Sequence, residues 1–216
     1  MKMNIKNTAI MYPLTGKLIT KMIQLGNAKL PKNIGIVNLP CKETCPWATD
    51  FCLGCCYAQK AENIRPACLP YRKRMLYATQ QDNFVDFMTN EVKRVNLYKH
   101  RIDYFRIHES GDFYSTDYYA KWLGIINNVP ELKFLAYTKN PNIGRIERPK
   151  NLILKLSWDI STDLQALNGA MKDYDGLAYT IPKGQTCPKG YFHCTETCHT
   201  CKYCYDGKGN VAFDQH

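Results

Sequence analysis

Eleven cysteines, gathered in two dense groups, constrain this 216-residue chain more than any other feature of its sequence. The first group is Cys41, Cys45, Cys52, Cys55 and Cys56, the second is Cys187, Cys194, Cys198, Cys201 and Cys204, and Cys68 stands alone. The sequence has neither the apolar segment of a secretory signal nor an apolar run long enough to span a membrane. We therefore expect a cytoplasmic protein without a membrane partner. In the reducing cytosol, clustered cysteines serve as metal or iron–sulfur ligands rather than as disulfides.

The balance of charge points to a polyanionic partner. The chain carries 29 Lys and Arg against 19 Asp and Glu, a formal net charge of +10. Such an excess favours a nucleic acid or a nucleotide. Thiolates bound to metal offset part of it, because two iron–sulfur sites together remove about three positive charges. A solvated basic surface without a specific partner explains the same excess, so both interpretations stay open.

Strand-like and helical patterns alternate along the middle of the chain. Strands are expected at residues 34–39, 104–108, 133–138, 152–157 and 176–181, and a long helix at residues 71–98. Ser115 is expected to N-cap a second helix, and Thr162 with Gln165 to form a capping box before a third. This alternation predicts an α/β fold with mostly parallel strands, and five strands suffice only for a partial, open βα barrel. We expect an N-terminal extension at 1–33, the partial barrel at 34–184, and a cysteine-rich, metal-binding segment at 185–216.

The first cysteine group directly follows the first predicted strand and precedes the long helix. Five thiols within 16 residues are more than one iron–sulfur cluster needs. Zinc also takes four thiolates and is the alternative. Zinc sites usually contain two C-x2-C pairs, however, whereas the intervals here are 3, 6, 2 and 0 residues. The pattern therefore favours an iron–sulfur cluster.

The second cysteine group follows the last predicted strand. Cys198, Cys201 and Cys204 form a C-x2-C-x2-C run, as in ferredoxins, and Cys187 precedes a proline. His193 and His199 keep zinc as the alternative here as well. The segment is too polar to form a core, so we expect metal binding to fold it.

Polar residues follow the second predicted strand in the run His108-Glu109-Ser110-Gly111-Asp112-Phe113. Ligands of parallel sheets bind beyond the carboxyl ends of the strands, so this run is a candidate cofactor site, together with Thr138 and Lys139 after the third strand. Carboxylates and carbonyls accept the hydrogen bonds of an ammonium group, and a lysine neutralises an anion. The alternatives are structural: Asp112 caps a helix, His108 is an ordinary core residue, and Lys139 is a solvated charge.

A cysteine loop after strand one of a partial βα barrel resembles the layout of radical S-adenosylmethionine (SAM) enzymes. A closer resemblance is to the gene product 88 family of phage and plasmid proteins, a group similar to the radical SAM enzymes. The residues that carry it are Asn38-Leu39-Pro40, Thr44-Cys45-Pro46, Cys52, Cys56-Tyr57-Ala58, Lys60-Ala61, residues 108–113, Tyr137-Thr138-Lys139 and the C-terminal cysteines. They span residues 26–204. The loop lacks the C-x3-C-x2-C spacing of radical SAM enzymes, so the resemblance to that group is one of layout.

The resemblance implies two [4Fe–4S] clusters. The first is held by Cys45, Cys52 and Cys56, and the second by Cys187, Cys198, Cys201 and Cys204. Cys41 and Cys55 are extra to the family pattern, which leaves open a fourth-ligand role for Cys41 and the choice between Cys55 and Cys56. Cys194-x3-Cys198-x2-Cys201 matches the radical SAM spacing, but it follows the last strand, where a SAM-binding cluster is not expected.

The resemblance further implies that SAM binds the open iron of the first cluster. The turn Ser110-Gly111-Asp112 is the counterpart of the segment that holds the SAM amino group. Glu109, His108, Thr138 and Lys139 are then candidates to line the same cofactor site.

Two hypotheses of function follow. In the first, the protein is a radical-SAM-like enzyme: an electron donor reduces the cluster, SAM is cleaved to methionine and a 5′-deoxyadenosyl radical, and the radical takes hydrogen from an unknown substrate, which the charge favours as a nucleic acid or nucleotide. In the second, it is a non-catalytic, metal-stabilised nucleic-acid-binding protein linked to phage or plasmid replication. The resemblance places either activity in a phage-infected or plasmid-bearing bacterium.

Overall fold

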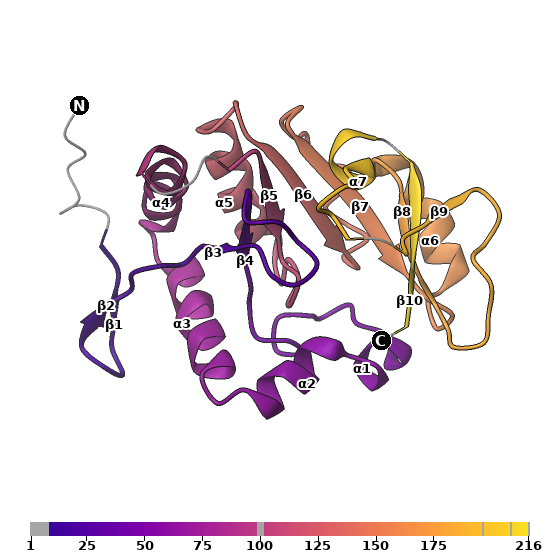
Figure 1. Ribbon diagram of the computed structural model, residues 1–216, viewed down its shortest axis with the longest axis horizontal. Coiled ribbons are helices and arrows are strands. Elements are labelled where there is room, and N and C mark those ends of the chain that lie inside the picture. Colours follow the sequence, from indigo (N-terminus) through magenta and orange to yellow (C-terminus); the bar gives the residue numbers. More distant parts are fainter. Residues whose placement is uncertain (1–8, 99–101, 196, 208, 216) are drawn as a thin grey trace.

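An eight-stranded sheet organises the protein in the computed structural model, which describes residues 9–98, 102–195, 197–207 and 209–215 (Figure 1). In spatial order the strands are β3 (Gln24–Leu25), β4 (Ile34–Val37), β5 (Tyr104–Ile107), β6 (Lys133–Thr138), β7 (Leu152–Trp158), β8 (Leu177–Ile181), β10 (Asn210–Asp214) and β9 (Tyr191–His193). Strand β3 runs antiparallel to β4, and the other neighbouring pairs are parallel. A separate hairpin pairs β1 (Met11–Tyr12) with β2 (Lys17–Leu18). The first eight residues of the predicted N-terminal extension lie outside the described residues.

Strands β4 to β8 lie side by side in the order of the chain. Because they are parallel, their carboxyl ends meet at one edge of the sheet. The sheet is open, with β3 and β9 as its edges. The predicted α/β class with a mostly parallel, open sheet is confirmed, and each of the five predicted strands is present. Strand β3 from the segment before residue 34, and β9 and β10 from the segment after residue 184, extend the same sheet.

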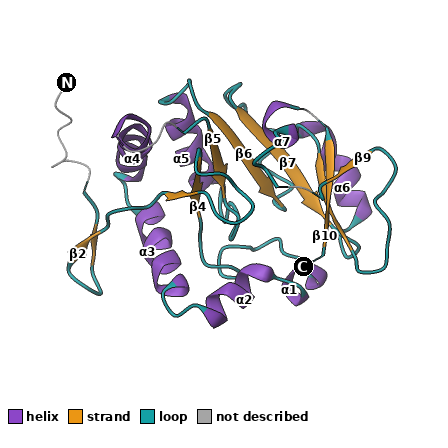
Figure 2. Ribbon diagram, in the orientation of Figure 1, coloured by secondary structure: helices purple, strands orange, loops and turns teal. Residues whose placement is uncertain are grey.

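Seven α-helices surround the sheet in the described part of the chain (Figure 2). They are α1 (Asp50–Gly54), α2 (Tyr57–Ile64), α3 (Cys68–Gln80), α4 (Phe84–Tyr98), α5 (Thr116–Asn127), α6 (Leu164–Ala170) and α7 (Tyr203–Asp206), and the 3-10 helix η2 (Met171–Asp173) follows α6. Within the described residues, no helix combines the length and the apolar composition that crossing a membrane requires.

The prediction of one continuous helix at residues 71–98 is wrong, because the chain turns between α3 and α4. Lys121 of α5 donates hydrogen bonds to the main-chain carbonyls of Thr79 and Gln81, at 2.9 and 3.0 Å. These bonds satisfy carbonyl groups that are left without partners where a helix ends. A contact from a distant helix therefore supports the break.

The two helix caps predicted from sequence have different outcomes. The Ser115 side chain accepts a hydrogen bond from the Tyr118 main-chain N–H at 3.1 Å, so its predicted capping of α5 is confirmed. Helix α6 is instead capped by Asp163, whose carboxylate accepts from the N–H of Gln165. The predicted capping box of Thr162 was therefore wrong, because the Thr162 hydroxyl accepts from the N–H of Asp159.

Each face of the sheet has its own apolar cluster, because successive strand residues point to opposite faces. Phe105 and Phe134 pack with the fully buried Trp122 against α3, α4 and α5. Leu135, the residue after Phe134, packs on the other face with Tyr205 of α7. Helices thus cover one face, while the cysteine-rich C-terminal segment covers part of the other (Figure 1).

Candidate metal centre

The loop between β4 and α2 brings most of the first cysteine group to the carboxyl edge of the sheet. Its turns are set by local bonds: the Cys45 N–H donates to the Lys42 carbonyl at 3.1 Å, and the Cys52 N–H donates to the Thr49 hydroxyl at 3.1 Å. Thr49 thereby N-caps α1, so Cys52 lies in its first turn. Cys56 is the N-cap residue of α2. Two short helices thus place Cys52 and Cys56 beside the turn that holds Cys45.

Cys45, Cys52 and Cys56 lie within electrostatic reach of one another. Burial, together with the negative charges of Asp112, Cys52 and Cys56, raises the pKa of Cys45 to about 12. Burial and the charge of Cys56, against the opposing charge of Lys139, raise the pKa of Cys52 to about 11. Without a cation Cys45 and Cys52 therefore stay protonated at neutral pH. A bound metal reverses this, because a coordinating thiol is deprotonated.

Cys41 is engaged outside this group of three. Its thiol donates to Glu62 Oε2 at 3.1 Å, and its main-chain N–H donates to Glu62 Oε1 at 3.0 Å. Glu62 in turn forms a buried ion pair with Arg72 at 2.7 Å. Burial and then the Glu62 hydrogen bond raise the pKa of Cys41, which holds its thiol protonated. The Cys41 side chain also interacts with Cys56, so it lies at the border of the group as a hydrogen-bonded thiol.

Cys55 differs from Cys56 in the groups that surround it. Cys55 is the C-cap residue of α1, and burial followed by the charge of Asp159 raises its pKa. The charge of Cys56 raises the pKa of both Cys45 and Cys52, whereas the charge of Cys55 raises the pKa of Cys52. The structure thus brings Cys45 together with Cys52 and Cys56, the same three residues that the family resemblance implies as ligands.

The turn after β5 is fastened to the cysteine loop. Asn38 Oδ1 accepts hydrogen bonds from the main-chain N–H groups of Glu109 and Ser110, at 2.8 and 3.0 Å, and Ser110 Oγ donates to the Leu39 carbonyl at 2.9 Å. Gly111 has φ of +83°, and a Cβ at this position would lie 2.6 Å from Thr44 Oγ1. Only glycine fits there, because a side chain would meet the cysteine loop in a conformation that L-residues avoid.

Asp112 joins this turn to the end of β6. Its Oδ1 accepts from the Thr138 hydroxyl and the Phe113 N–H, each at 2.6 Å, and its Oδ2 accepts from the Lys139 N–H at 2.8 Å. Burial raises the pKa of this carboxyl despite these bonds. A carboxylate has about four acceptor positions, so three of them are used within the chain. The carboxylate therefore fits a role in holding the site together better than the predicted role of binding the SAM amino group.

Lys139 and Asp159 connect the ends of β6 and β7 to α1. Lys139 Nζ forms an ion pair with Asp159 Oδ2 at 2.6 Å, and the Thr49 hydroxyl donates to the same oxygen at 2.6 Å. The Asp159 side chain is 1% exposed and that of Lys139 is 11% exposed. Lys139 is thus a buried, paired cation beside Cys52 rather than a solvated surface charge.

Two other predicted site residues bond elsewhere. His108 is buried against Phe113, Tyr118 and Trp122, with its Nε2 2.8 Å from the Tyr118 hydroxyl. Burial lowers the pKa of His108 to about 3, so this histidine is a neutral core residue. Glu109 Oε1 accepts from the Asn27 side-chain amide at 2.7 Å, just after the end of the edge strand β3.

The C-terminal cysteines divide between two places. Cys198 and Cys204 pack against the cluster of Leu135 and Tyr137 on the second face of the sheet, and the charge of Cys201 acts on both. Cys187 packs instead against a cluster that includes Tyr179 and Ile181.

The remaining metal candidates of this segment are engaged elsewhere or exposed. The Cys194 N–H donates to the Ala212 carbonyl at 2.8 Å, and His193 pairs with Asp214 at 2.9 Å. His199 is exposed.

The structure does not decide between the two predicted kinds of metal site. Across the ranges that the structure describes, no three His, Cys, Asp or Glu side chains are arranged to hold one metal ion. A tetrahedral zinc ion requires its thiolates around a single point, whereas the thiolates of an iron–sulfur cluster bind different irons. Zinc and iron–sulfur binding at these cysteines therefore both stay predictions.

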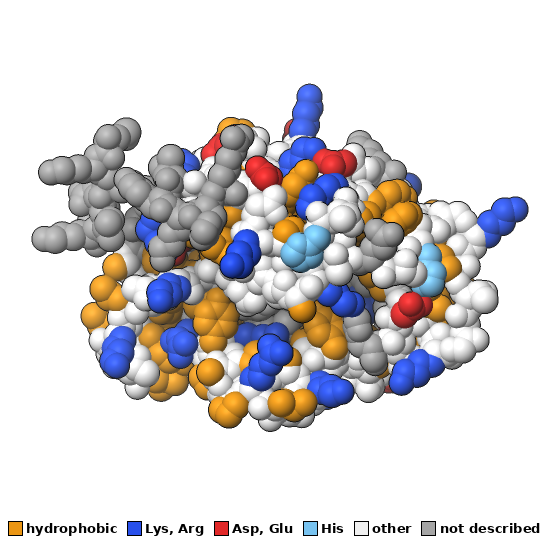
Figure 3. Space-filling view, in the orientation of Figure 1, with side chains coloured by type: hydrophobic (Ala, Val, Ile, Leu, Met, Phe, Trp, Pro, Cys, Tyr) orange, Lys and Arg blue, Asp and Glu red, His pale blue; other side chains and the backbone are white. Residues whose placement is uncertain are grey.

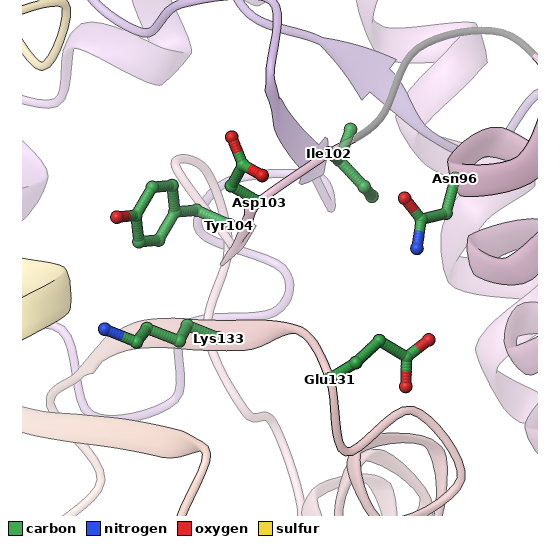
Figure 4. Close-up of a pocket in the computed structure, with 6 residues that line it drawn as sticks. All are labelled: Asn96, Ile102, Asp103, Tyr104, Glu131 and Lys133. Carbon is green, nitrogen blue, oxygen red and sulfur yellow. The ribbon is translucent and has the colours of Figure 1, made fainter.

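A shallow pocket lies at the opposite edge of the sheet, at the amino ends of β5 and β6 (Figure 4). It is lined by Asn96, Ile102, Asp103, Tyr104, Glu131 and Lys133. Asp103 accepts from the Asn33 side-chain amide, and Lys133 pairs with Asp206. Its Tyr104 belongs to the same apolar cluster as Cys198 and Cys204, whereas the first cysteine group lies at the other edge of the sheet.

Comparison with known proteins confirms the predicted relation to the gene product 88 family, while the resemblance to radical SAM enzymes stays a prediction. The family described as Gene product 88 matches residues 14–175. A protein named "Gene 88 protein" from Mycobacterium phage L5 is 28% identical over 218 residues, which cover 87% of this chain and 89% of the relative. Its namesake from Mycobacterium phage D29 is 35% identical over 126 residues, 53% of this chain and 50% of the relative. No solved structure matches the chain. Because the family match covers most of its length, this chain belongs to the Gene product 88 family.

Proposed function

We propose that this protein is a radical-SAM-like iron–sulfur enzyme whose [4Fe–4S] cluster is bound by Cys45, Cys52 and Cys56. The observation that carries the proposal is that the loop after the carboxyl end of β4 places these three cysteines close enough for the charges of Cys52 and Cys56 to act on Cys45. Strands β4 to β8 follow one another in chain order, as they do in a βα barrel. Ligands of such sheets bind at this edge.

The number of available thiols supports a cluster with one iron open to a small molecule. Two further thiols lie near the group: Cys41, whose bond to Glu62 keeps it a hydrogen-bond donor, and Cys55, which caps the end of α1. Three thiolates leave one iron of a [4Fe–4S] cluster without a protein ligand. When bound there, SAM supplies a 5′-deoxyadenosyl radical after it accepts one electron, which an electron-donor partner must provide.

The residues around the thiols hold the site in place and shape its charge. Asp112 and Asp159 lock the ends of β5, β6 and β7 to the cysteine loop. Lys139 places a positive charge beside Cys52, which suits an anionic cluster or the carboxylate of SAM. Figure 3 shows the surface hollowed between the edge of the sheet and helices α1 and α2, with Lys and Arg side chains along the hollow. An anionic substrate, such as a nucleotide, fits this charge.

Binding of SAM to an open iron tests the proposal. After anaerobic reconstitution and reduction, addition of SAM should change the electron paramagnetic resonance spectrum of the cluster, and 5′-deoxyadenosine should form. The control is the Cys52→Ala variant, which should show neither effect because its cluster lacks a ligand. An unchanged spectrum and no 5′-deoxyadenosine from the wild-type protein would place it in the structural or electron-transfer class.

A second candidate function, nucleic-acid binding, is favoured by where the positive charge lies. Residues 1–80 carry 12 Lys and Arg against 3 Asp and Glu, a net charge of +9, whereas residues 81–216 carry 17 against 16. Lys17, Lys21, Lys42, Lys60 and Arg65 are exposed in this first part of the chain. Figure 3 shows Lys and Arg side chains spread over the region of β1, β2 and α1 to α3.

Weak binding to single- or double-stranded DNA should therefore fall as salt rises, because phosphate contacts release counterions. Lys60 lies on α2 and Arg65 follows its end. Replacing both by Gln should reduce the slope of log binding constant against log salt concentration by about 1–2. The matched control replaces Lys172 and Lys183, which are also exposed but lie in the electrically balanced part of the chain. Measurement is by fluorescence anisotropy between about 20 and 200 mM salt. An equal effect of both double variants, or no binding at low salt, would remove nucleic acid as a partner.

A further inference from the structure

The hairpin of β1 and β2 is packed against the body of the protein at its base. Ile10 and Ile19 are buried in the main apolar cluster, and the Ile19 N–H donates to the Ile10 carbonyl at 2.7 Å. The Tyr12 ring meets the Tyr77 ring of α3 edge to face, with 5.5 Å between their centroids. Figure 1 shows the loop of the hairpin directed away from the sheet, at one end of the molecule. The hairpin is thus a projection with a packed base.

Apolar side chains gather toward the free end of this hairpin. Leu14 in its turn is 81% exposed, and Met11 and Leu18 on its strands are 58% and 54% exposed. Met11 and Leu18 are register partners, so their side chains lie side by side on one face. Pro13, next to Leu14, is exposed as well. Neighbouring exposed apolar side chains of this kind indicate an interaction site.

The charge around this apolar tip is positive. Residues 1–42 carry seven lysines and neither Asp nor Glu, and the first acidic residue of the chain is Glu43. Lys17 on β2 and Lys21 beyond it are exposed, and neither forms an ion pair with a described residue. Helix α3, against which the hairpin packs, contains no acidic residue. Figure 3 shows Lys and Arg side chains interspersed with apolar ones over this region. The surface therefore fits a polyanion that also offers apolar contacts.

Lys21 has an unusual backbone conformation. Its φ is +65°, in the left-handed region that favours glycine. The next residue is the buried Met22, whose carbonyl accepts from the Tyr71 hydroxyl at 2.5 Å. The backbone beside Lys21 is thus held by α3 while the lysine side chain is exposed. A lysine where glycine would be less strained is expected when its charge has a role.

We propose that the β1–β2 hairpin is an arm that binds double-stranded DNA, with Pro13 and Leu14 entering a groove and Lys17 and Lys21 contacting phosphates. This inference rests on the second candidate function, nucleic-acid binding, and assigns that function a surface. Leu, Met and Pro are side chains that architectural proteins insert between the base pairs of duplex DNA. Proteins that bind single strands instead stack bases on aromatic rings, whereas the exposed apolar side chains at this tip are aliphatic.

The apolar tip is tested by Leu14→Ser, with fluorescence anisotropy on a short DNA duplex and energy transfer between dyes at its two ends. The substitution should weaken duplex binding about tenfold, the scale of losing one apolar contact that excludes water. It should also abolish the bending of the duplex that inserted side chains cause. The salt dependence should stay unchanged, because no charge is removed. The matched control is Leu164→Ser, which removes a leucine that is 60% exposed on α6 and should change none of these quantities.

Lys17→Gln combined with Lys21→Gln should have the complementary effect. The slope of log binding constant against log salt concentration should fall by about 2, because two phosphate contacts are lost. Lys21→Gly alone should reduce this slope by about 1. Its melting temperature should be at least that of the wild type, because glycine suits a φ of +65°. The matched control is Lys172→Gln, which removes an exposed lysine from the electrically balanced part of the chain.

The outcomes separate this inference from the function on which it rests. Duplex binding by the wild type that the Leu14 and lysine variants all retain in full would refute the hairpin as the contact surface and leave nucleic-acid binding standing. No duplex binding by the wild type at low salt would refute both. Equal binding of single strands and duplexes would refute the duplex arm. So would binding of phosphatidylglycerol vesicles that Leu14→Ser abolishes without changing DNA binding.

Discussion

A single substitution to Ala at Cys45, at Cys52 or at Cys56 should abolish the first cluster and leave the C-terminal cluster in place. The three half-buried thiols lie within electrostatic reach of one another, and a [4Fe–4S] cluster that already has an open iron does not tolerate loss of a second ligand. Iron and sulfide should fall by about half, from eight to four per chain. The electron paramagnetic resonance signal that responds to SAM should disappear.

Cys41→Ala and Cys68→Ala are the matched controls for these substitutions. Cys41 lies beside the three thiols but donates to Glu62, and Cys68 begins α3 on another part of the chain. Both variants should keep full iron and the SAM response. Loss of the cluster in the Cys41 variant would mean that this thiol is a fourth ligand, and the open iron required for SAM would not exist.

The Glu62→Ala variant should lose about 3–5 kcal/mol of folding free energy, because it leaves the Arg72 charge buried without a partner. The side chains of Glu62 and Arg72 are 9% and 8% exposed. Although burial alone would raise it, the pKa of Glu62 is lowered by hydrogen bonds from Arg72 and from Cys41. The pair therefore joins α2, α3 and the cysteine loop, and its loss should loosen all three.

Urea unfolding of the metal-free protein measures this effect without interference from cluster loss. Glu91→Ala is the matched control, since it breaks a more exposed ion pair with Arg94 within α4 and should cost less than about 1 kcal/mol. Equal costs for the two variants would show that the Glu62 pair does not hold the loop. Glu62→Ala should also reduce the yield of reconstituted first cluster, which connects the ion pair to the site.

The fold was predictable where local pattern and burial agree. Strands β4, β6 and β7 are short, mostly apolar and mostly buried runs, and such runs stand out in the sequence. The break between α3 and α4 could not be predicted from local pattern, because Lys121 supports it from the distant helix α5. The cap of α6 was misassigned by one residue because Thr162 and Asp163 are both good cap residues.

The sequence shows the two groups of cysteines, and their role as ligands stays a prediction, but the side chains that surround them could not be predicted. The sequence left Cys55 and Cys56 equivalent as neighbours, and the difference between them arises from two short helices. Nothing in the sequence marks Glu62 as part of the site, because its role depends on a contact with Cys41, which lies 21 residues earlier in the chain.

The most direct test of the central claim is iron, sulfide and zinc analysis of anaerobically purified wild-type protein. Two thiolate clusters predict about eight iron and eight sulfide per chain, a brown colour and absorbance near 400 nm, with no stoichiometric zinc. Zinc at one or two equivalents with no sulfide would contradict both clusters and leave a zinc-stabilised nucleic-acid-binding protein as the better account of this chain.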